Sequence, residues 1–336
     1  MRNINDIFRG VHTALITPFT STGAVDIGAF KRLVEYQIEA GIDGLVPCGT
    51  TGESSTLTHD EHDRVIALTV EYAAGRVPVI AGTGSNATIE AIQLSQHAEQ
   101  SGVDAVLVVN PYYVKPTQKG LYLHFKAVAE SISIPCIVYN IEGRTGVNLE
   151  NETLLCLMNE RPNIVGVKEA SGSLSQMKNL LGLRLEQFVV LCGDDNMTVD
   201  LIEAGGNGVV SVAANLIPRQ MKAMVHSALN GDFEKARMLF ELAVKLKDES
   251  GVKVELINMG GGIGIPYHPD DRAVDLNYVS NAMQKLYAEL IVPAGLDPIQ
   301  IVFECGRLVT GPYGYLVSRA LQVVRKYKDY VGLDSC

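Results

Sequence analysis

Residues 163–170 read NIVGVKEA, and this stretch decides how the rest of the chain is interpreted. Residues 164–167 are apolar or glycine, and Lys168 and Glu169 follow them directly. The run is continuous rather than alternating, which is typical of a parallel strand buried on both faces. Such a strand needs similar strands beside it, so the sequence should contain more runs of this kind.

Seven further runs match it, at 11–19, 44–49, 78–84, 105–111, 135–141, 188–194 and 208–215. Between them lie segments such as THDEHDRVIALTVEYAAG (58–75), with an acidic first turn, helical spacing of apolar residues and a terminal glycine. Eight such units before about residue 230 predict an α/β fold, a (β/α)8 TIM barrel. A doubly wound sheet is the alternative, but no GxGxxG motif follows the first run.

Composition excludes several classes of protein. The 336 residues are 47% apolar and 20% charged, unlike a disordered chain, and the net charge of −10 disfavours a general nucleic-acid binder. No apolar run reaches about 18 residues, and the N-terminus lacks the pattern of a signal peptide. The six cysteines are widely spaced, without zinc-ligand spacing. We therefore expect reduced thiols in a cytoplasmic protein that binds neither nucleic acid nor membrane.

Polar side chains gather where the predicted strands end, at the edge of a barrel that carries catalytic groups. They are Thr50, Thr51, Glu53, Tyr112, Tyr113, Tyr139, Asn140, Lys168 and Glu169. A surface or capping role remains the alternative for any one of them, but the set points to one site.

Lys168 carries the most specific signal. Burial disfavours the charged form of a lysine, and a neutral amine in a barrel mouth can form a Schiff base with a carbonyl substrate. Pairing with Glu169, or extension of the lysine to the rim, is the alternative. Tyr139, Thr50 and Tyr113 offer hydroxyls for the proton transfers that imine formation requires.

Two groups could bind carboxylates near this lysine. The turn GTTGE (49–53) offers backbone N–H groups, and Arg144 could bind a second carboxylate through two parallel hydrogen bonds. This combination predicts an aldolase-like enzyme that joins a 2-oxo acid to an aldehyde bearing a carboxylate.

Several motifs, in order along about residues 5–238, resemble the dihydrodipicolinate synthase family. They are GTTGESSTL (49–57), VIAGTGSNAT (79–88), NPYYVKP (110–116), YNIEGRTGVNL (139–149), VGVKEAS (165–171) and GDD (193–195). The resemblance implies a lyase of lysine and diaminopimelate biosynthesis that condenses pyruvate with aspartate semialdehyde and needs no cofactor. The related N-acetylneuraminate lyase family typically has Ser in place of Thr51 and lacks Arg144.

The resemblance also implies roles for single residues. Lys168 would form the imine with pyruvate, Tyr139 would donate protons, and Thr50 and Tyr113 would complete the relay, with Tyr113 reaching a neighbouring subunit of a homodimer or homotetramer. Thr51 and the Val210 carbonyl would contact pyruvate, and Arg144 would bind the semialdehyde carboxylate. Lysine would inhibit the enzyme allosterically at a site formed by Ser54, Ser55, His59, His62, Asn86, Glu90 and Tyr112.

His59 and His62 can also be interpreted without the resemblance. Their spacing places them on one face at the start of a predicted helix. A polar helix start is the simplest interpretation, and a metal site is disfavoured because no third ligand lies nearby in the sequence.

The sequence changes character near residue 238. VELINMGGGIGIPYHPDD (254–271) and IQIVFECGRLVTGPYGYLV (299–317) resemble diaminopimelate decarboxylase, whose GGGIG run and E-x-GR motif bind cofactor phosphate and substrate. Residues 239–336 would be an appended fragment with two strands, 254–261 and 299–306, outside the barrel. Its residual phosphate loop would contain Gly260, Gly261, Gly262, Glu304 and Arg307, although the family's cofactor lysine has no counterpart, so pyridoxal phosphate is not expected. A weakly active fusion that binds pathway metabolites, or another pyruvate-dependent aldolase, is the alternative function.

Overall fold

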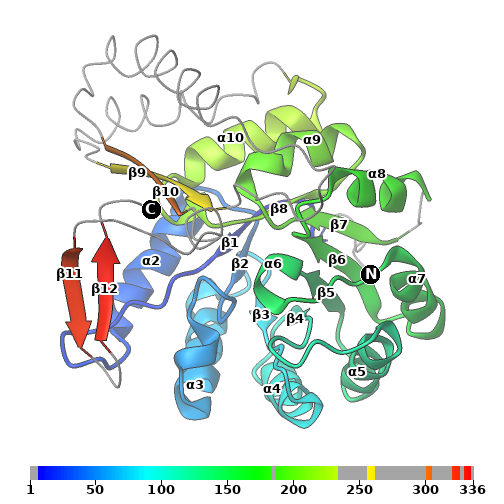
Figure 1. The fold of residues 1–336 in the computed structure, drawn as a ribbon, viewed down its shortest axis with the longest axis horizontal. Helices are drawn as coiled ribbons and strands as arrows, with labels where there is room; N and C mark the ends of the chain where they lie inside the picture. The colour runs from blue at the N-terminus through cyan, green and yellow to red at the C-terminus, as the bar shows by residue number, and fades with distance from the viewer. Residues whose placement is uncertain are drawn as a thin grey trace. The chain divides into compact units, whose positions relative to one another are not determined.

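The computed structural model describes residues 7–183 and 187–233, together with the backbone of four strands at 256–261, 300–304, 320–325 and 329–333. The chain divides into two compact units, Met1–Met238 and Leu239–Cys336. The first unit contains every residue proposed above for catalysis and for lysine binding. Figure 1 shows this unit as a set of strands with helices around them.

Eight parallel strands build the first unit, and they confirm the predicted (β/α)8 barrel. They are β1 (Gly10–Ala14), β2 (Gly44–Val46), β3 (Ile80–Gly82), β4 (Ala105–Val109), β5 (Cys136–Asn140), β6 (Ile164–Glu169), β7 (Val189–Cys192) and β8 (Gly208–Ser211). Hydrogen bonding runs in the order β2-β1-β8-β7-β6-β5-β4-β3. A parallel bridge between Leu45 and Val79 joins the two ends of this order, so the sheet closes on itself.

Each strand leads into a helix that covers the outside of the barrel. The helices are α2 (Ile27–Glu39), α3 (His59–Ala73), α4 (Thr88–Gln100), α5 (Gln118–Glu130), α7 (Asn151–Glu160), α8 (Leu174–Gly182), α9 (Thr198–Glu203) and α10 (Pro218–Leu229). The short helix α6 (Glu142–Thr145) and three 3-10 turns, η1 (Ser54–Thr56), η2 (Asp195–Met197) and η3 (Ala213–Asn215), lie in loops after strands. Among the described helices, none is long and apolar enough to cross a membrane.

Local sequence signals explain where several helices begin. The Asp26 side chain accepts a hydrogen bond from the backbone N–H of Ala29 and so caps α2. Thr58 and Glu61 form a reciprocal capping box at the start of α3. The capping box fixes the first turn of α3, which carries His59 and His62.

The strands are shorter than the apolar runs that predicted them. The run 11–19 gives a strand only to Ala14, and beyond it Ile16 is 43% exposed and Phe19 is 38% exposed. Residues 15–19 of this run form the loop that leaves the barrel at its carboxyl edge. Apolar character therefore extends past the hydrogen-bonded ladder into the segments that surround the site.

The barrel interior is filled by apolar side chains from its strands, including Leu107, Ile137, Leu191 and Val210. Cys48, Cys136 and Cys192 are buried free thiols, but Cys156 is exposed on α7, so burial does not extend to every cysteine. Burial raises the pKa of the Cys136 and Cys192 thiols to about 12, which keeps both protonated at neutral pH.

The second unit contains two small sheets. Strands β9 (Leu256–Gly261) and β10 (Gln300–Glu304) pair in parallel, and neither is part of the eight-stranded sheet. They lie within the two predicted runs 254–261 and 299–306. Strands β11 (Ala320–Arg325) and β12 (Asp329–Leu333) form an antiparallel pair that the sequence analysis did not predict.

Candidate active site

The ends of β5 and β6 bring the two most specific residues of the sequence together. The register pairs Tyr139 with Lys168 and, one step further, Asn140 with Glu169. Lys168 is 6% exposed and Tyr139 is 5% exposed. The Lys168 Nζ atom lies 4.0 Å from the centre of the Tyr139 ring. A buried amine beside a phenol is the arrangement that Schiff-base chemistry needs.

The end of β7 completes the surroundings of Lys168. The Gly193 N–H donates to the Glu169 carbonyl over 2.8 Å. A Cβ atom at position 193 would lie 2.5 Å from the Ala170 Cβ and 3.1 Å from the Lys168 Cε, so only glycine fits here without displacing the lysine.

Asp194 adds a carboxyl group that the sequence analysis did not assign, although it quoted the GDD motif. Burial raises the pKa of this carboxyl, and the positive charges of Lys168 and Arg144 oppose that rise. Both cationic groups therefore act on the same carboxyl. The mouth of the barrel thus combines an amine, a carboxyl group and a guanidinium.

The GTTGE turn after β2 lies at the same edge of the barrel and has a constrained backbone. Cys48 and Glu53, at its two ends, have φ angles of 53° and 58°. Such left-handed conformations in residues other than glycine concentrate at functional sites. In the described part of the chain, the backbone N–H groups of Thr50 and Thr51 have no acceptor, which leaves them available for a bound carboxylate.

The predicted proton relay is not connected within this chain. Tyr113 is 87% exposed and has a φ of 71°, whereas Tyr139 is buried. Across the described residues, no hydrogen bond joins Tyr139, Thr50 or Tyr113. The relay therefore stays a prediction.

Arg144 and Val210 belong to different parts of the barrel, the loop after β5 and strand β8. Arg144 is exposed on α6, directly after β5. Val210 is 1% exposed in β8, where it pairs with His12 of β1. The structure thus places every residue proposed for substrate binding on the carboxyl side of a strand or within it.

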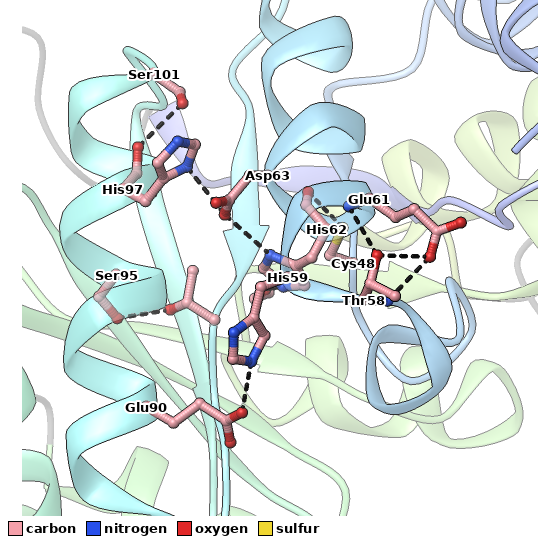
Figure 2. Close-up of polar contacts among 12 residues, drawn as sticks. Cys48, Thr58, His59, Glu61, His62, Asp63, Glu90, Ser95, His97 and Ser101 are labelled. Carbon is pink, nitrogen blue, oxygen red and sulfur yellow. Dashed lines mark hydrogen bonds and ion pairs between the residues drawn. The ribbon is translucent and has the colours of Figure 1, made fainter.

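A second group of polar residues lies between α3 and α4, and we call His59, His62, Asp63, Glu90 and His97 the helix-pair cluster (Figure 2). The His59 Nε2 lies 2.7 Å from the Glu90 Oε1, and Ser85 donates to the same carboxylate. His62 is buried and its Nε2 bonds the Gly82 carbonyl over 2.9 Å.

Two members of this cluster were missed by the sequence analysis. The Asp63 Oδ1 lies 3.0 Å from the His97 Nδ1 and 3.8 Å from the His62 Nδ1. Asp63 follows His62 directly, but nothing local in the sequence indicates that His97 of the next helix would meet it. A pocket with about 270 Å³ of empty volume is lined by His59, Asp63, Glu90, Gln93, Leu94 and His97.

The other residues of the predicted lysine site lie in segments that follow strands or precede helices of the barrel. Ser54 and Ser55 are in η1, Asn86 precedes α4, and Tyr112 follows β4. No hydrogen bond between these four and the helix-pair cluster is present within the described ranges. The described residues as a whole contain no group of three or more His, Cys, Asp or Glu side chains placed to hold a metal ion.

The predicted phosphate loop falls only partly on described residues. Gly260 and Gly261 end β9, and Glu304 ends β10 in register with Gly261. Gly262 and Arg307 lie outside the described residues.

Comparisons with known proteins agree with both resemblances. The model of the dihydrodipicolinate synthetase family matches residues 7–259, and that of the pyridoxal-binding domain of pyridoxal-dependent decarboxylases matches residues 224–311. The two matches overlap at 224–259, so the first family extends past the predicted change at residue 238.

Individual proteins give the same result. The chain is 52% identical over 242 residues to the 4-hydroxy-tetrahydrodipicolinate synthase of Syntrophus aciditrophicus, covering 72% of this chain and 82% of that protein. The pyruvate-complexed dihydrodipicolinate synthase of Acinetobacter baumannii is 36% identical, with a TM-score of 0.69 over 86% of this chain and 99% of that one.

The lysine-bound enzyme from Cyanidioschyzon merolae is 35% identical, with a TM-score of 0.68 over 86% of this chain and 99% of that one. The barrel, the strand-end residues and these matches agree, and the chain belongs to the dihydrodipicolinate synthetase family.

Proposed function

We propose that the chain is a 4-hydroxy-tetrahydrodipicolinate synthase, a lyase that condenses pyruvate with L-aspartate 4-semialdehyde in lysine biosynthesis. The observation that carries this proposal is the buried Lys168, whose Nζ lies 4.0 Å from the centre of the Tyr139 ring. Family membership supports the same reaction. Each substrate contributes one carboxylate and one reacting carbonyl, and the site offers groups for all of them.

The reaction begins at Lys168. After the Lys168 amine loses its proton, it attacks the C2 carbonyl of pyruvate, and loss of water gives an imine. Tyr139 supplies and accepts the protons of this step. Loss of a methyl proton then gives an enamine whose carbon attacks the aldehyde, and the amino group of the second substrate finally displaces Lys168 as the ring closes.

The carboxylates of the two substrates are bound separately. The free N–H groups at Thr50 and Thr51 and the Val210 carbonyl form the pyruvate side. Arg144 binds the carboxylate of the semialdehyde through parallel hydrogen bonds. Tyr113, exposed on its loop, completes the relay from a second copy of the chain, so the active form is a homodimer or homotetramer.

Borohydride trapping tests the central step. Pyruvate with borohydride should add one reduced pyruvyl group, located at Lys168 by peptide mass spectrometry. Lys168→Ala should lose the label, whereas Lys126→Ala, a change at a partly exposed lysine of α5, should keep it. A label on another lysine, with Lys168 unmodified, would contradict the assignment.

The condensation proceeds without pyridoxal phosphate, because the imine to Lys168 itself activates pyruvate. Residues 239–336 form an appended fragment, in keeping with the division of the chain at Met238 and the separate pairing of β9 with β10. Limited proteolysis should cut between about 240 and 255 and leave a barrel fragment. Added pyridoxal phosphate should give no aldimine absorption that depends on Lys168. A protease-resistant tail, or such an absorption band, would overturn this part of the proposal.

A further inference from the structure

A buried carboxylate lies directly behind the catalytic lysine. Glu169 ends β6 and is 1% exposed. Because successive side chains of a strand point to opposite faces, Glu169 points away from the side that Lys168 occupies. Its Oε1 accepts from the Ser171 N–H over 2.7 Å, and its Oε2 accepts from the Gln176 Nε2 of α8 over 3.3 Å. Among the described residues, no cation is paired with it.

Asn140 connects this carboxylate to the neighbouring strands. Its Nδ2 donates to the Glu169 Oε2 over 3.1 Å and to the Asn148 Oδ1 over 2.8 Å. Its Oδ1 accepts from the Asn110 Nδ2 over 2.8 Å and from the Leu149 N–H over 2.9 Å. Asn140 is fully buried, so its own amide has no contact with water. The amide can therefore be oriented in only one way.

The network holds the segment 145–149, which begins at the last residue of α6, the short helix that carries Arg144. The Val147 carbonyl accepts from the Asn110 Nδ2 over 3.0 Å and from the Thr145 Oγ1 over 3.0 Å. Asn148 donates from its Nδ2 to the Gln176 Oε1 over 2.8 Å. Residues 146–149 of this segment belong to no strand or helix, so side-chain hydrogen bonds replace the ladder that holds the strands.

Lys168 itself is held differently. Its backbone lies in register with Tyr139 of β5 on one side and with Leu191 of β7 on the other. A change in the network should therefore loosen the segment next to Arg144 while the lysine keeps its place in the sheet.

From this difference we infer that Glu169 is a positioning residue for the second substrate: through Asn140 it fixes the segment 145–149 and so the place of Arg144. The inference rests on the proposed function, in which Arg144 binds the carboxylate of aspartate semialdehyde. It distinguishes Glu169 from its neighbour Lys168, which touches the first substrate.

Glu169→Gln tests this with almost no change in shape. The new amide keeps an oxygen toward the Ser171 N–H and turns its NH₂ group toward the donors of Asn140 and Gln176. Asn140 cannot rotate its amide to compensate, because its Oδ1 already accepts from Asn110 and Leu149. Buried donors that face each other are costly, so the segment should move.

We expect Glu169→Gln to change the KM values of the two substrates differently. The KM for aspartate semialdehyde should rise about tenfold, while the KM for pyruvate and the yield of borohydride trapping at Lys168 stay within about twofold. Asn148→Ala, in the partly buried part of the network, should shift the same KM in the same direction by a smaller factor. Glu160→Gln, the same chemical change at an exposed position of α7, should alter neither KM.

The outcomes separate this inference from the proposed function. If the wild-type protein does not trap pyruvate at Lys168, both fail. If it does, but Glu169→Gln and Asn148→Ala leave the KM for the semialdehyde unchanged, only the positioning role is overturned. The same holds if Glu169→Gln loses trapping and raises both KM values together, because this would show general support of the barrel.

Discussion

The site around Tyr139 and Lys168, which we call the strand-end site, and the helix-pair cluster are built in different ways from the same barrel. In the strand-end site, Tyr139 and Lys168 face each other because the backbone ladder of β5 and β6 pairs them. In the helix-pair cluster, His59 and Glu90 meet because two side chains from separate helices extend toward each other (Figure 2). The first pair is buried, whereas the His59 side chain is 64% exposed.

This difference bears on what each region can do. A buried pair fixed by a sheet keeps its geometry without a ligand, which suits a catalytic step. An exposed pair on two helices is weakly held, since exposed ion pairs contribute little to stability. Its geometry can respond to a bound molecule, which suits a regulatory site. The comparison predicts that substitutions in the strand-end site strongly lower turnover, whereas substitutions in the helix-pair cluster change inhibition.

Tyr139→Phe gives the largest expected effect on the catalytic side of the comparison. The variant keeps the ring beside Lys168 and removes only the hydroxyl. Loss of a group that transfers protons should lower kcat by about 10²–10⁴-fold, with the KM for pyruvate changed far less. Steady-state kinetics with both substrates measures this. Tyr122→Phe, at a tyrosine of α5 that donates to Glu160, serves as the matched control and should keep normal turnover. An unchanged kcat in Tyr139→Phe would show that ring packing, rather than proton transfer, explains the residue.

The second prediction concerns the helix-pair cluster. Lysine at millimolar concentration should inhibit the enzyme, and His59→Ala should raise the concentration for half inhibition by about tenfold or more, because the His59–Glu90 pair is lost. Tyr112→Ala should act in the same direction. His226→Ala, a change on α10 at a histidine bonded to Asp43, should leave inhibition intact. An active wild-type enzyme that lysine does not inhibit would overturn the regulatory interpretation and leave the catalytic one untouched.

Much of the strand-end site could be predicted from the sequence, because its geometry follows from strand order and period. Polar residues such as Lys168 follow the apolar runs directly. Parallel strands place these ends at one edge of the barrel. The positions of Lys168 and Tyr139 could therefore be predicted without knowing how the loops fold. The extent of each strand was overestimated, since residues such as Ile16 and Phe19 are apolar although they belong to the loop after β1.

The partners of side chains outside the ladder could not be predicted in this way. The contact of His97 with Asp63 depends on how far α3 and α4 are rotated against each other, and helical spacing within one helix does not determine this. Glu169 was noted only as a possible partner of Lys168, yet it faces Asn140 and Gln176 instead. Side chains alternate between the two faces of β6, and this alternation could have indicated that Lys168 and Glu169 point in opposite directions.

The smallest expected effect tests whether burial also determines the charge of a side chain in the helices that surround the barrel. His124 on α5 is 4% exposed, and its Nδ1 lies 2.9 Å from the Thr88 Oγ1. Burial lowers the pKa of His124 from 6.5 to about 4. Between these values the unfolded chain binds a proton that the folded chain does not, so stability is full above pH 6.5 and falls as the pH drops toward 4.

His124→Gln removes this proton uptake while keeping a polar group near Thr88. Urea unfolding at pH 7 and pH 5 should show a smaller loss of stability in the variant than in the wild-type protein, by about 1–2 kcal/mol. Some acid sensitivity should remain, because burial also lowers the pKa of His12 and His62. Leu123→Gln, at the exposed neighbouring position of α5, should lose as much stability on acidification as the wild type. An equal loss in His124→Gln would mean that the folded protein accepts the proton at this position, and that the helix layer is more open there than the contacts of His124 indicate.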